Sequence, residues 1–189
     1  MLVIGAAFYL VAGAIGRGEI RLTGLDPQSA QGDRAVVEIL RDMGADIRWE
    51  GSALVSRASR LHGLRVDCAQ IPDLVPILAV AMAAAEGDSR ITGAARLRIK
   101  ESDRLSAMAA ALTAAGADAA ELPDGLAIRG GKTLHAAKIE GCNDHRIVMA
   151  MTIASALSDG EWTITDAEAT AKSAPAFWQE FERLGGLAR

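Results

Sequence analysis

Four cationic side chains gather in the stretch RLRIKESDRL, residues 96–105, directly before an alanine-rich segment that is expected to be helical. They are Arg96, Arg98, Lys100 and Arg104. The N-terminal end of a helix already carries a partial positive charge, so cations placed there repel the helix end and one another. An anion bound between them would remove that repulsion. The stretch therefore predicts a binding site for an anionic group.

Three further polar clusters stand at or next to the start of a segment expected to be helical. They read IPD at 71–73, NDHR at 143–146 and TAKSAP at 170–175. Helix starts attract anions, arginine and lysine bind phosphate or carboxylate, and carboxylates or histidine beside them can move protons. Together with the stretch 96–105, these clusters offer seven residues for an anion-binding, proton-transferring site: Asp73, Lys100, Glu101, Arg104, His145, Arg146 and Lys172.

Each of these residues also has a purely structural interpretation. Asp73 and Asp144 could simply cap helices, and the charges of 100–104 could be solvated ion pairs. His145 could be a histidine with satisfied hydrogen bonds at a helix start, and Lys172 could be an ordinary loop lysine. The position of the clusters at equivalent places in an internal repeat favours a shared site.

The repeat runs through the whole chain, and each copy has an apolar helix, a short strand that ends in threonine, and a second helix. The threonines, Thr23, Thr92 and Thr165, stand at nearly equal intervals. The first helices, AAFYLVAGAI, LVPILAVAMAAA and RIVMAMTIASAL, are apolar almost all round, which indicates burial. Short β-prone pieces lie between the copies. The pattern predicts an α/β fold in which three units share one interior, as a single domain over 1–189.

The second helices are expected to lie outside this core. In the second copy, one apolar stripe is formed by Leu105, Met108, Ala109 and Leu112. Gly44 and Gly116 stand at equivalent places, where glycine typically ends a helix.

Composition excludes several functional classes. Half of the 189 residues are hydrophobic, the net charge is -4 and only 4% are aromatic, which argues against a nucleic-acid surface. Cys68 and Cys142 lack the spacing of a zinc site or a disulfide framework, so we expect reduced thiols and a cytoplasmic protein.

The apolar run MLVIGAAFYLVAGAI at the start is too short for a comfortable membrane span and lacks the basic residues of a signal peptide. We interpret it as the first helix of the first copy. Asp73 and Asp144 stand at similar distances ahead of Thr92 and Thr165, as helix caps, whereas the same distance before Thr23 leads to Leu2, Val3 and Ile4. The first copy is therefore expected to lack its cap and the strand before it, and the chain to be part of something longer.

The segments RIKESDRL, NDHRIVMAMTIAS, IPD and TAKSAPAFW resemble the C-terminal lobe of the 5-enolpyruvylshikimate-3-phosphate synthase family, and TGLDPQSAQGD and LRDMGAD agree with the same lobe. The resemblance covers essentially the whole chain. It implies a fold of two lobes, each made of three βαβαββ units with buried parallel helices and outer sheets. Residues 1–189 would then be the C-terminal lobe alone, without the N-terminal lobe.

The resemblance also implies a reaction, in which the enolpyruvyl group of phosphoenolpyruvate moves to the 5-hydroxyl of shikimate 3-phosphate and phosphate is released. Asp73 would accept the hydroxyl proton and Lys100 would help to hold that substrate. Arg104, Arg146 and Lys172 would bind phosphoenolpyruvate, with Glu101 and His145 near the carbon that is protonated. No cofactor, metal, nucleic acid or membrane is implied, and the missing N-terminal lobe is the expected partner.

Two departures and two alternatives accompany this interpretation. The family's N-terminal lobe, with its phosphate-binding residues, is expected to lie outside these 189 residues, and LVIG stands where the family has a small, serine-containing segment. The chain could instead resemble a lobe of UDP-N-acetylglucosamine enolpyruvyl transferase, against which KESDR argues. It could also be a non-catalytic remnant that acts as a binding or structural module. The fragment by itself is expected to be inactive.

Overall fold

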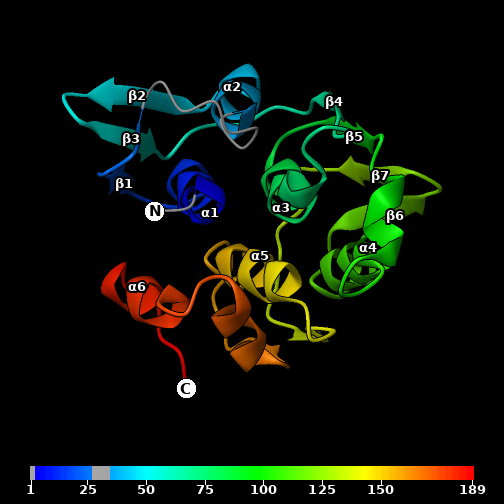
Figure 1. The fold of residues 1–189 in the computed structure, drawn as a ribbon. Helices are drawn as coiled ribbons and strands as arrows, with labels where there is room; N and C mark the ends of the chain where they lie inside the picture. The colour runs from blue at the N-terminus through cyan, green and yellow to red at the C-terminus, as the bar shows by residue number, and fades with distance from the viewer. Residues whose placement is uncertain (1–2, 27–34) are drawn as a thin grey trace.

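The computed structural model describes residues 3–26 and 35–189 of the chain. At its centre lie three apolar helices that contact one another, α1 (Val3–Ile15), α3 (Val75–Ala84) and α5 (His145–Ser155) (Figure 1). Every residue from Val75 to Ala83 is buried, because α3 offers apolar side chains in all directions. The prediction that the first helix of each copy forms the core is confirmed.

Strands and outer helices surround this centre in units that follow the repeat (Figure 1). The first unit adds β1 (Glu19–Leu22), α2 (Ala35–Asp42), β2 (Asp46–Glu50) and β3 (Ala53–Arg57). The second contains β4 (Arg65–Asp67), the short 3-10 helices η2 (Pro72–Leu74) and η3 (Ala95–Ile99), β5 (Asp88–Thr92), α4 (Arg104–Ala114), β6 (Asp118–Leu122) and β7 (Gly125–Arg129). The third contains β8 (Lys138–Ile139), β9 (Thr163–Ile164), the 3-10 helix η4 (Ala167–Lys172) and α6 (Phe177–Arg183).

The sheets of the units share one topology. The first has the order β1-β3-β2 and the second β4-β5-β7-β6, so that β1, β3 and β2 correspond to β5, β7 and β6, with the same antiparallel pairing. The third sheet pairs β8 with β9 in parallel, as β4 pairs with β5. The α/β repeat is confirmed, with one correction. Within the described residues only the second unit is a full βαβαββ, since the first has no counterpart of β4 and the third ends after α6.

The outer helices pack by one face, as predicted. In α4 the residues Leu105, Met108, Ala109 and Leu112 are all buried. Helix-ending glycines take the left-handed conformation at Gly44 (φ 96°) and Gly116 (φ 91°), and also at Gly185 after α6 (φ 97°). The third copy therefore ends its second helix in the same way as the other two.

The two predicted aspartate caps differ. Asp144 caps α5, where its side chain accepts a hydrogen bond from the Arg146 N–H. The prediction for Asp73 is wrong, because Asp73 lies inside η2 and no side chain caps that turn or α3. Proline at position 72 starts a separate 3-10 turn ahead of α3, which turns the Asp73 carboxylate toward cations of the neighbouring segments.

The apolar run at the start forms α1, whose residues from Ala6 to Val11 are buried in the core. Among the described residues, no helix is both long and apolar enough to cross a membrane. Of the positions where the first cap was sought, Leu2 lies outside the described residues and Val3 and Ile4 already belong to α1. Residues 27–33 of TGLDPQSAQGD also lie outside them. Cys68 is a buried and Cys142 an exposed free thiol.

Candidate active site

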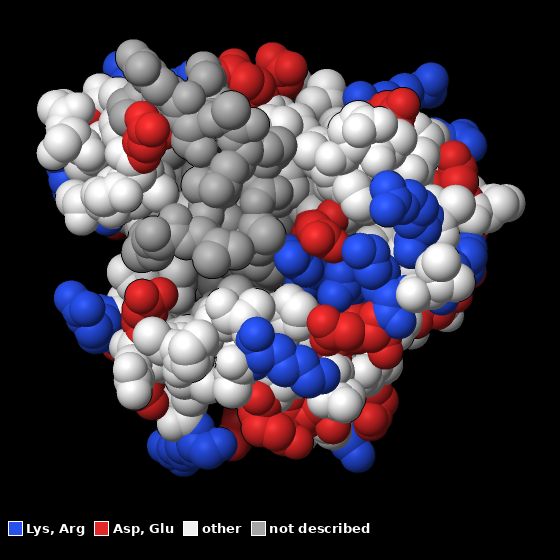
Figure 2. Space-filling view, viewed as in Figure 1, with Lys and Arg blue, Asp and Glu red and all other residues white. Residues whose placement is uncertain are grey.

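All seven residues named from the sequence meet in one cluster at the N-terminal ends of α3, α4 and α5. In the region of these helices, one face of the molecule carries Lys and Arg side chains gathered around acidic ones (Figure 2). The apolar side chains of α3 and α5 pack together and hold the two helices side by side, so that the polar residues at the starts of the helices lie together.

Arg104, the first residue of α4, is the centre of the cluster, with a side chain that is only 3% exposed. Its Nε donates to Asp144 at 2.7 Å and its Nη1 to Asp73 at 3.0 Å, while Nη2 lies 3.7 Å from Glu101. Asp144 is fully buried and also accepts from the Ser102 hydroxyl at 3.0 Å. One guanidinium thus joins residues from three segments of the chain.

The Asp73 carboxylate faces three cations. Besides Arg104, Arg146 approaches it with Nη2 at 3.3 Å, and Lys100 Nζ lies at 3.9 Å. Arg146 also donates from Nη1 to the Asp73 carbonyl oxygen at 3.0 Å. About a third of the Asp73 side chain stays exposed, so this carboxylate lies at the surface of the cluster, above the buried arginines.

Glu101 forms the opposite side of the cluster. Its carboxylate lies 3.1 Å from His145 Nδ1 and 3.6 Å from Lys172 Nζ. His145 is buried, and within the described part of the chain its Nε2 has no hydrogen-bond partner. An imidazole with one nitrogen on a carboxylate and the other unpaired can take up or release a proton next to Glu101.

Lys172, at the end of η4, is held by a residue that sequence reasoning did not single out. Its Nζ donates to both the carbonyl oxygen and Oδ1 of Asn143. Asn143 and its neighbour Cys142 both have left-handed backbones (φ 47° and 54°), and the Asn143 N–H donates to Asp166. This unusual turn places two oxygens of one residue on the same lysine.

The charge of the buried Asp144 carboxylate determines the electrostatics of the cluster. Burial by itself raises the pKa of this carboxyl, but the Arg104 guanidinium, the Arg146 N–H and the Ser102 hydroxyl together lower its pKa below the ordinary value. Asp144 is therefore a buried anion at neutral pH, and it anchors Arg104. Among the paired groups of the cluster, the cations outnumber the carboxylates by one. The cations are Lys100, Arg104, Arg146 and Lys172, and the carboxylates are Asp73, Glu101 and Asp144.

The charged stretch of residues 96–105 divides into two parts, which corrects the expectation that all four of its cations surround one anion. Arg98 does not join the cluster, because its guanidinium is bound to Asp103, Glu121 and the carbonyl oxygens of Leu122 and Pro123. It fastens η3 to the β6–β7 hairpin. Arg96 is exposed, whereas Lys100 and Arg104 lie within 4 Å of the Asp73 carboxylate in the cluster.

Three residues that sequence reasoning missed complete the site. Asp144 was interpreted only as a cap, Ser102 was not considered, and Asn143 was passed over inside NDHR. In the sequence all three stand directly beside residues that were named, and this proximity could have indicated that they belong to the site. Their partners, however, lie far away in the sequence, so their contacts depend on the tertiary fold.

The carboxylates of Glu101 and Asp144 and a ring nitrogen of His145 come within 4.8 Å of one another, close enough for a metal ion. The Arg104 guanidinium, however, lies against both carboxylates and already supplies the positive charge that a metal would bring. This donor set therefore suits the arginine better than a cation.

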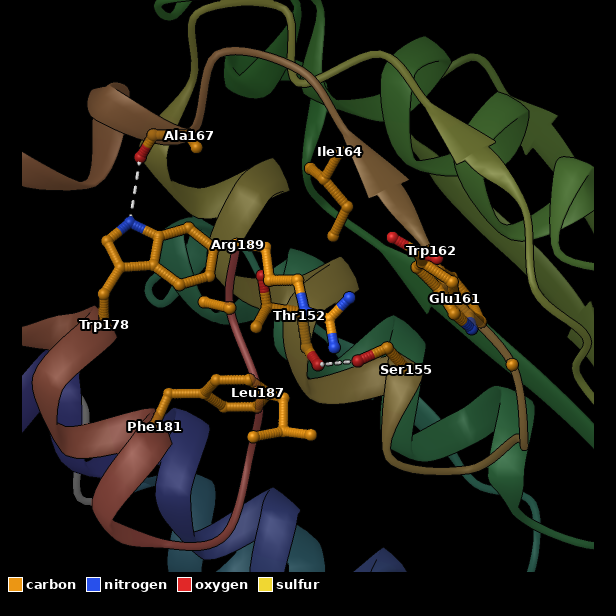
Figure 3. Close-up of a pocket in the computed structure, with 12 residues that line it drawn as sticks. Thr152, Ser155, Glu161, Trp162, Ile164, Ala167, Trp178, Phe181, Leu187 and Arg189 are labelled. Atoms are coloured by element: carbon orange, nitrogen blue, oxygen red, sulfur yellow. Dashed lines mark hydrogen bonds between the residues drawn. The ribbon is translucent and has the colours of Figure 1, made fainter.

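A cavity lined by other residues lies toward the C-terminal end of α5 (Figure 3). It has a volume of about 610 Å3, and Trp178 and Phe181 line it together with Thr152. Glu161 and Arg189 are the charged residues among those that line it, and both are exposed. The charged cluster, with its convergent cations and carboxylates, is the better candidate for chemistry.

Comparison with known proteins gives the family and the fold. A family model described as EPSP synthase (3-phosphoshikimate 1-carboxyvinyltransferase) matches residues 3–181. The chain belongs to the EPSP synthase family. The family resemblance predicted from KESDR and NDHR is thus confirmed.

Curated relatives agree with this assignment. The 3-phosphoshikimate 1-carboxyvinyltransferases of Clostridium novyi and Halobacterium salinarum are each 45% identical to this chain over 96% of its length. The matches cover 41% and 43% of those relatives. The chain therefore spans less than half the length of the curated relatives it matches.

Solved structures give the same result for the fold. EPSP synthase from Acinetobacter baumannii matches with a TM-score of 0.81 and 34% identity, over 96% of this chain and 45% of that chain. The enolpyruvyl transferase NikO from Streptomyces tendae matches with a TM-score of 0.79 over 99% of this chain and 43% of that chain, at 18% identity, which supports the fold alone. The prediction of an enolpyruvyl transferase lobe is confirmed at the level of fold.

Proposed function

We propose that this chain supplies one lobe of an enzyme that transfers the enolpyruvyl group of phosphoenolpyruvate to the 5-hydroxyl of shikimate 3-phosphate and releases phosphate. The observation that carries the proposal is the convergence of Arg104, Arg146 and Lys172 with Asp73 and Glu101 in a member of the EPSP synthase family. The relatives named 3-phosphoshikimate 1-carboxyvinyltransferase supply the choice of substrates.

Phosphoenolpyruvate carries a phosphate and a carboxylate, and the cluster offers guanidinium and ammonium groups for both. Arg104 and Arg146 are buried and tied to Asp144 or Asp73, which holds their donors in place before any ligand arrives. Lys172 is 42% exposed and Lys100 37%, so these side chains can turn toward a bound anion. The excess of cations over carboxylates favours an anionic ligand.

Asp73 is the proposed base for the attacking hydroxyl. In the structure its oxygens are bound by Arg104 and Arg146. When phosphoenolpyruvate draws those guanidinium groups onto its own oxygens, a carboxylate oxygen of Asp73 becomes available to accept the hydroxyl proton. Binding of the donor would then prepare the base for the acceptor.

Glu101 and His145 are proposed to serve the enolpyruvyl carbon. The hydroxyl oxygen forms a bond to C2 of phosphoenolpyruvate, and C3 takes up a proton to give a tetrahedral adduct. Loss of a proton from C3 and cleavage of the C2–O bond to phosphate then restore the double bond. Glu101 and His145, 3.1 Å apart, can exchange this proton between a carboxylate and an imidazole.

The second lobe is proposed as the partner that completes the site, because the chain spans less than half of its relatives. A reaction that excludes water needs groups on both sides of the substrate. We therefore expect no turnover from this chain alone. Since the substrates are small water-soluble anions, we also propose the cytoplasm as its place of action.

The test is complementation. The purified chain is assayed for enolpyruvylshikimate 3-phosphate alone and after mixing with the separately expressed N-terminal lobe of the Clostridium novyi relative. Product from the mixture but not from the chain supports the proposal. Product from the chain alone would show that one lobe suffices, and association of the lobes without turnover would favour a non-catalytic module. Replacing shikimate 3-phosphate by UDP-N-acetylglucosamine tests the alternative that the chain is a lobe of UDP-N-acetylglucosamine enolpyruvyl transferase. We expect no product in that assay.

A further inference from the structure

Asn143 is bound to both ends of the short helix η4. Its backbone N–H donates to Asp166 Oδ2 at 2.9 Å, and Asp166 directly precedes the first residue of η4. Lys172 is the last residue of η4, and its Nζ donates to the Asn143 carbonyl oxygen and, at 3.0 Å, to Asn143 Oδ1. One residue thus fixes where η4 begins and where its terminal lysine points.

The backbone of Asn143 makes this double contact possible. Cys142 and Asn143 are consecutive residues in the left-handed conformation, and the turn presents a main-chain and a side-chain oxygen to the same ammonium group. Asparagine and aspartate adopt this conformation more readily than other residues with a side chain, and glycine adopts it without strain. The backbone therefore allows three residue types at position 143, and the chemistry of the side chain must distinguish them.

The remainder of η4 is anchored independently of Asn143. Trp178 Nε1 donates to the Ala167 carbonyl oxygen at 3.1 Å (Figure 3), and η4 packs against α5. The Lys172 side chain is long and partly exposed, so without partners it would sample many rotamers. The two oxygens of Asn143 therefore restrict the part of η4 that packing leaves free.

These two oxygens hold Lys172 without cancelling its charge, because an amide and a peptide carbonyl are both neutral. An ammonium group has three N–H donors, so two contacts with Asn143 leave a third donor for a ligand. The Glu101 carboxylate lies 3.6 Å from Nζ, too far for a hydrogen bond. Aspartate at position 143 would hold the lysine equally well, but its charge would offset the one that an anionic ligand needs.

We propose that Asn143 is a positioning residue for Lys172, which presents the ammonium group to the anionic substrate in one orientation and with its full charge. The inference rests on the proposed function, in which Lys172 binds phosphoenolpyruvate. Asn143 acts through the lysine and lowers the cost of ordering that side chain when the ligand binds. Its effect therefore falls on the affinity for phosphoenolpyruvate more than on the chemical step.

Glycine and aspartate at position 143 separate orientation from charge, because both fit the left-handed backbone. Asn143→Gly keeps the N–H and the carbonyl oxygen and removes Oδ1. The dissociation constant of phosphoenolpyruvate, measured by NMR titration of the isotope-labelled chain, should rise about threefold to tenfold. Asn143→Asp should weaken binding by more than about tenfold, because it neutralises the lysine. A purely structural role would lower the melting temperature in both variants and leave the affinity of the folded chain unchanged, which would overturn the proposal.

Double variants test whether the effect passes through Lys172. In a Lys172→Ala background, Asn143→Gly should change the dissociation constant by less than about twofold, since no side chain remains to be positioned. Arg104 and Arg146 stay in place and keep the binding measurable. In the matched Lys132→Ala background, which removes an exposed lysine outside the cluster, Asn143→Gly should keep its full effect. An effect of equal size in both backgrounds would contradict positioning through Lys172.

Kinetics of the complemented two-lobed enzyme separate this proposal from the proposed function. Asn143→Gly should raise KM for phosphoenolpyruvate while kcat stays within about twofold of its original value. A fall in kcat at unchanged KM would overturn the positioning role. Absence of turnover with the natural chain, while the binding differences persist, would refute the proposed function and leave the positioning role supported. Equal binding by the natural chain and both variants, or no binding by the natural chain, would overturn the positioning role whatever the turnover.

Discussion

Arg104 and Asp144 form an ion pair beneath the candidate active site, with Nε and Oδ2 2.7 Å apart and side chains that are 3% and 0% exposed. The pair joins the first turn of α4 to the cap of α5, two elements that lie far apart in the sequence. Asp144 therefore links the stability of the core to the geometry of the cluster.

Replacing Asp144 by asparagine should lower the free energy of unfolding by about 3 kcal/mol, because a buried guanidinium loses its nearest counter-charge. Asp73 and Glu101 remain beside Arg104 and limit the loss. Urea unfolding at neutral pH measures it. The matched control is Asp88→Asn, which removes an exposed partner of Arg129 and should change stability by no more than about 0.5 kcal/mol. Equal effects at the two positions would contradict a special role for Asp144.

The same carboxyl makes stability depend on pH. Because the pKa of Asp144 is lower in the folded chain than in the unfolded one, its contribution is complete above the unfolded value of about 3.9 and is lost as the pH falls through the folded value. Unfolding free energies measured from pH 7 downward should therefore decrease more steeply below about pH 4 for the natural chain than for Asp144→Asn. Parallel curves would exclude this residue as the source.

Glu101→Gln should separate catalysis from binding in the complemented two-lobed enzyme. The substitution keeps the size of the side chain but removes a proton acceptor 3.1 Å from His145, so kcat should fall by roughly 10²- to 10⁴-fold. KM for phosphoenolpyruvate should stay the same or decrease, because the cations remain. The control is Glu121→Gln, which changes an ion-pair partner of Arg98 outside the cluster and should leave kcat unchanged. An unchanged kcat in Glu101→Gln would return Glu101 to the role of an ion-pair partner.

Anion binding by the lobe alone should be weak and partly dependent on salt. Phosphoenolpyruvate or phosphate should raise the melting temperature of the chain. Lys172→Ala should reduce that rise, whereas Lys132→Ala, at a similarly exposed lysine paired with Asp118, should not. Added salt should screen the exposed lysines more than the buried Arg104 and Arg146, so that part of the effect persists. Identical rises in all three proteins would argue against the site.

Gly116 and Gly185 offer a direct test of the repeat. Alanine at either position should cost about 1–2 kcal/mol, because both backbones are left-handed. At Gly116 the new methyl group would also meet the His135 ring at 2.7 Å, whereas at Gly185 it would meet none of the described residues within 4 Å. Gly116→Ala should therefore be the more destabilising by about 1 kcal/mol or more in thermal unfolding. His135→Ala should remove most of that difference, and a difference that survives it would have another cause.

Much of this protein is determined by the sequence itself. Uniformly apolar helices such as Val75–Ala84 can be satisfied only in an interior, and the stripe of α4 can pack only by one face, so the layered repeat follows from hydrophobic pattern. Gly44 and Gly116 indicate where helices end, because glycine adopts the left-handed conformation without strain. The members of the cluster could also be named, because their types and local spacing suit an anion and a proton.

Their partners were decided only by the tertiary structure. Arg98 and Arg104 stand in the same charged stretch, yet one fastens a hairpin at Glu121 while the other is buried against Asp73 and Asp144. Asp73 was expected to cap a helix and instead faces two guanidinium groups. Local sequence sets backbone propensity over a few residues, but which charges meet depends on how distant segments pack, and that is a property of the whole fold.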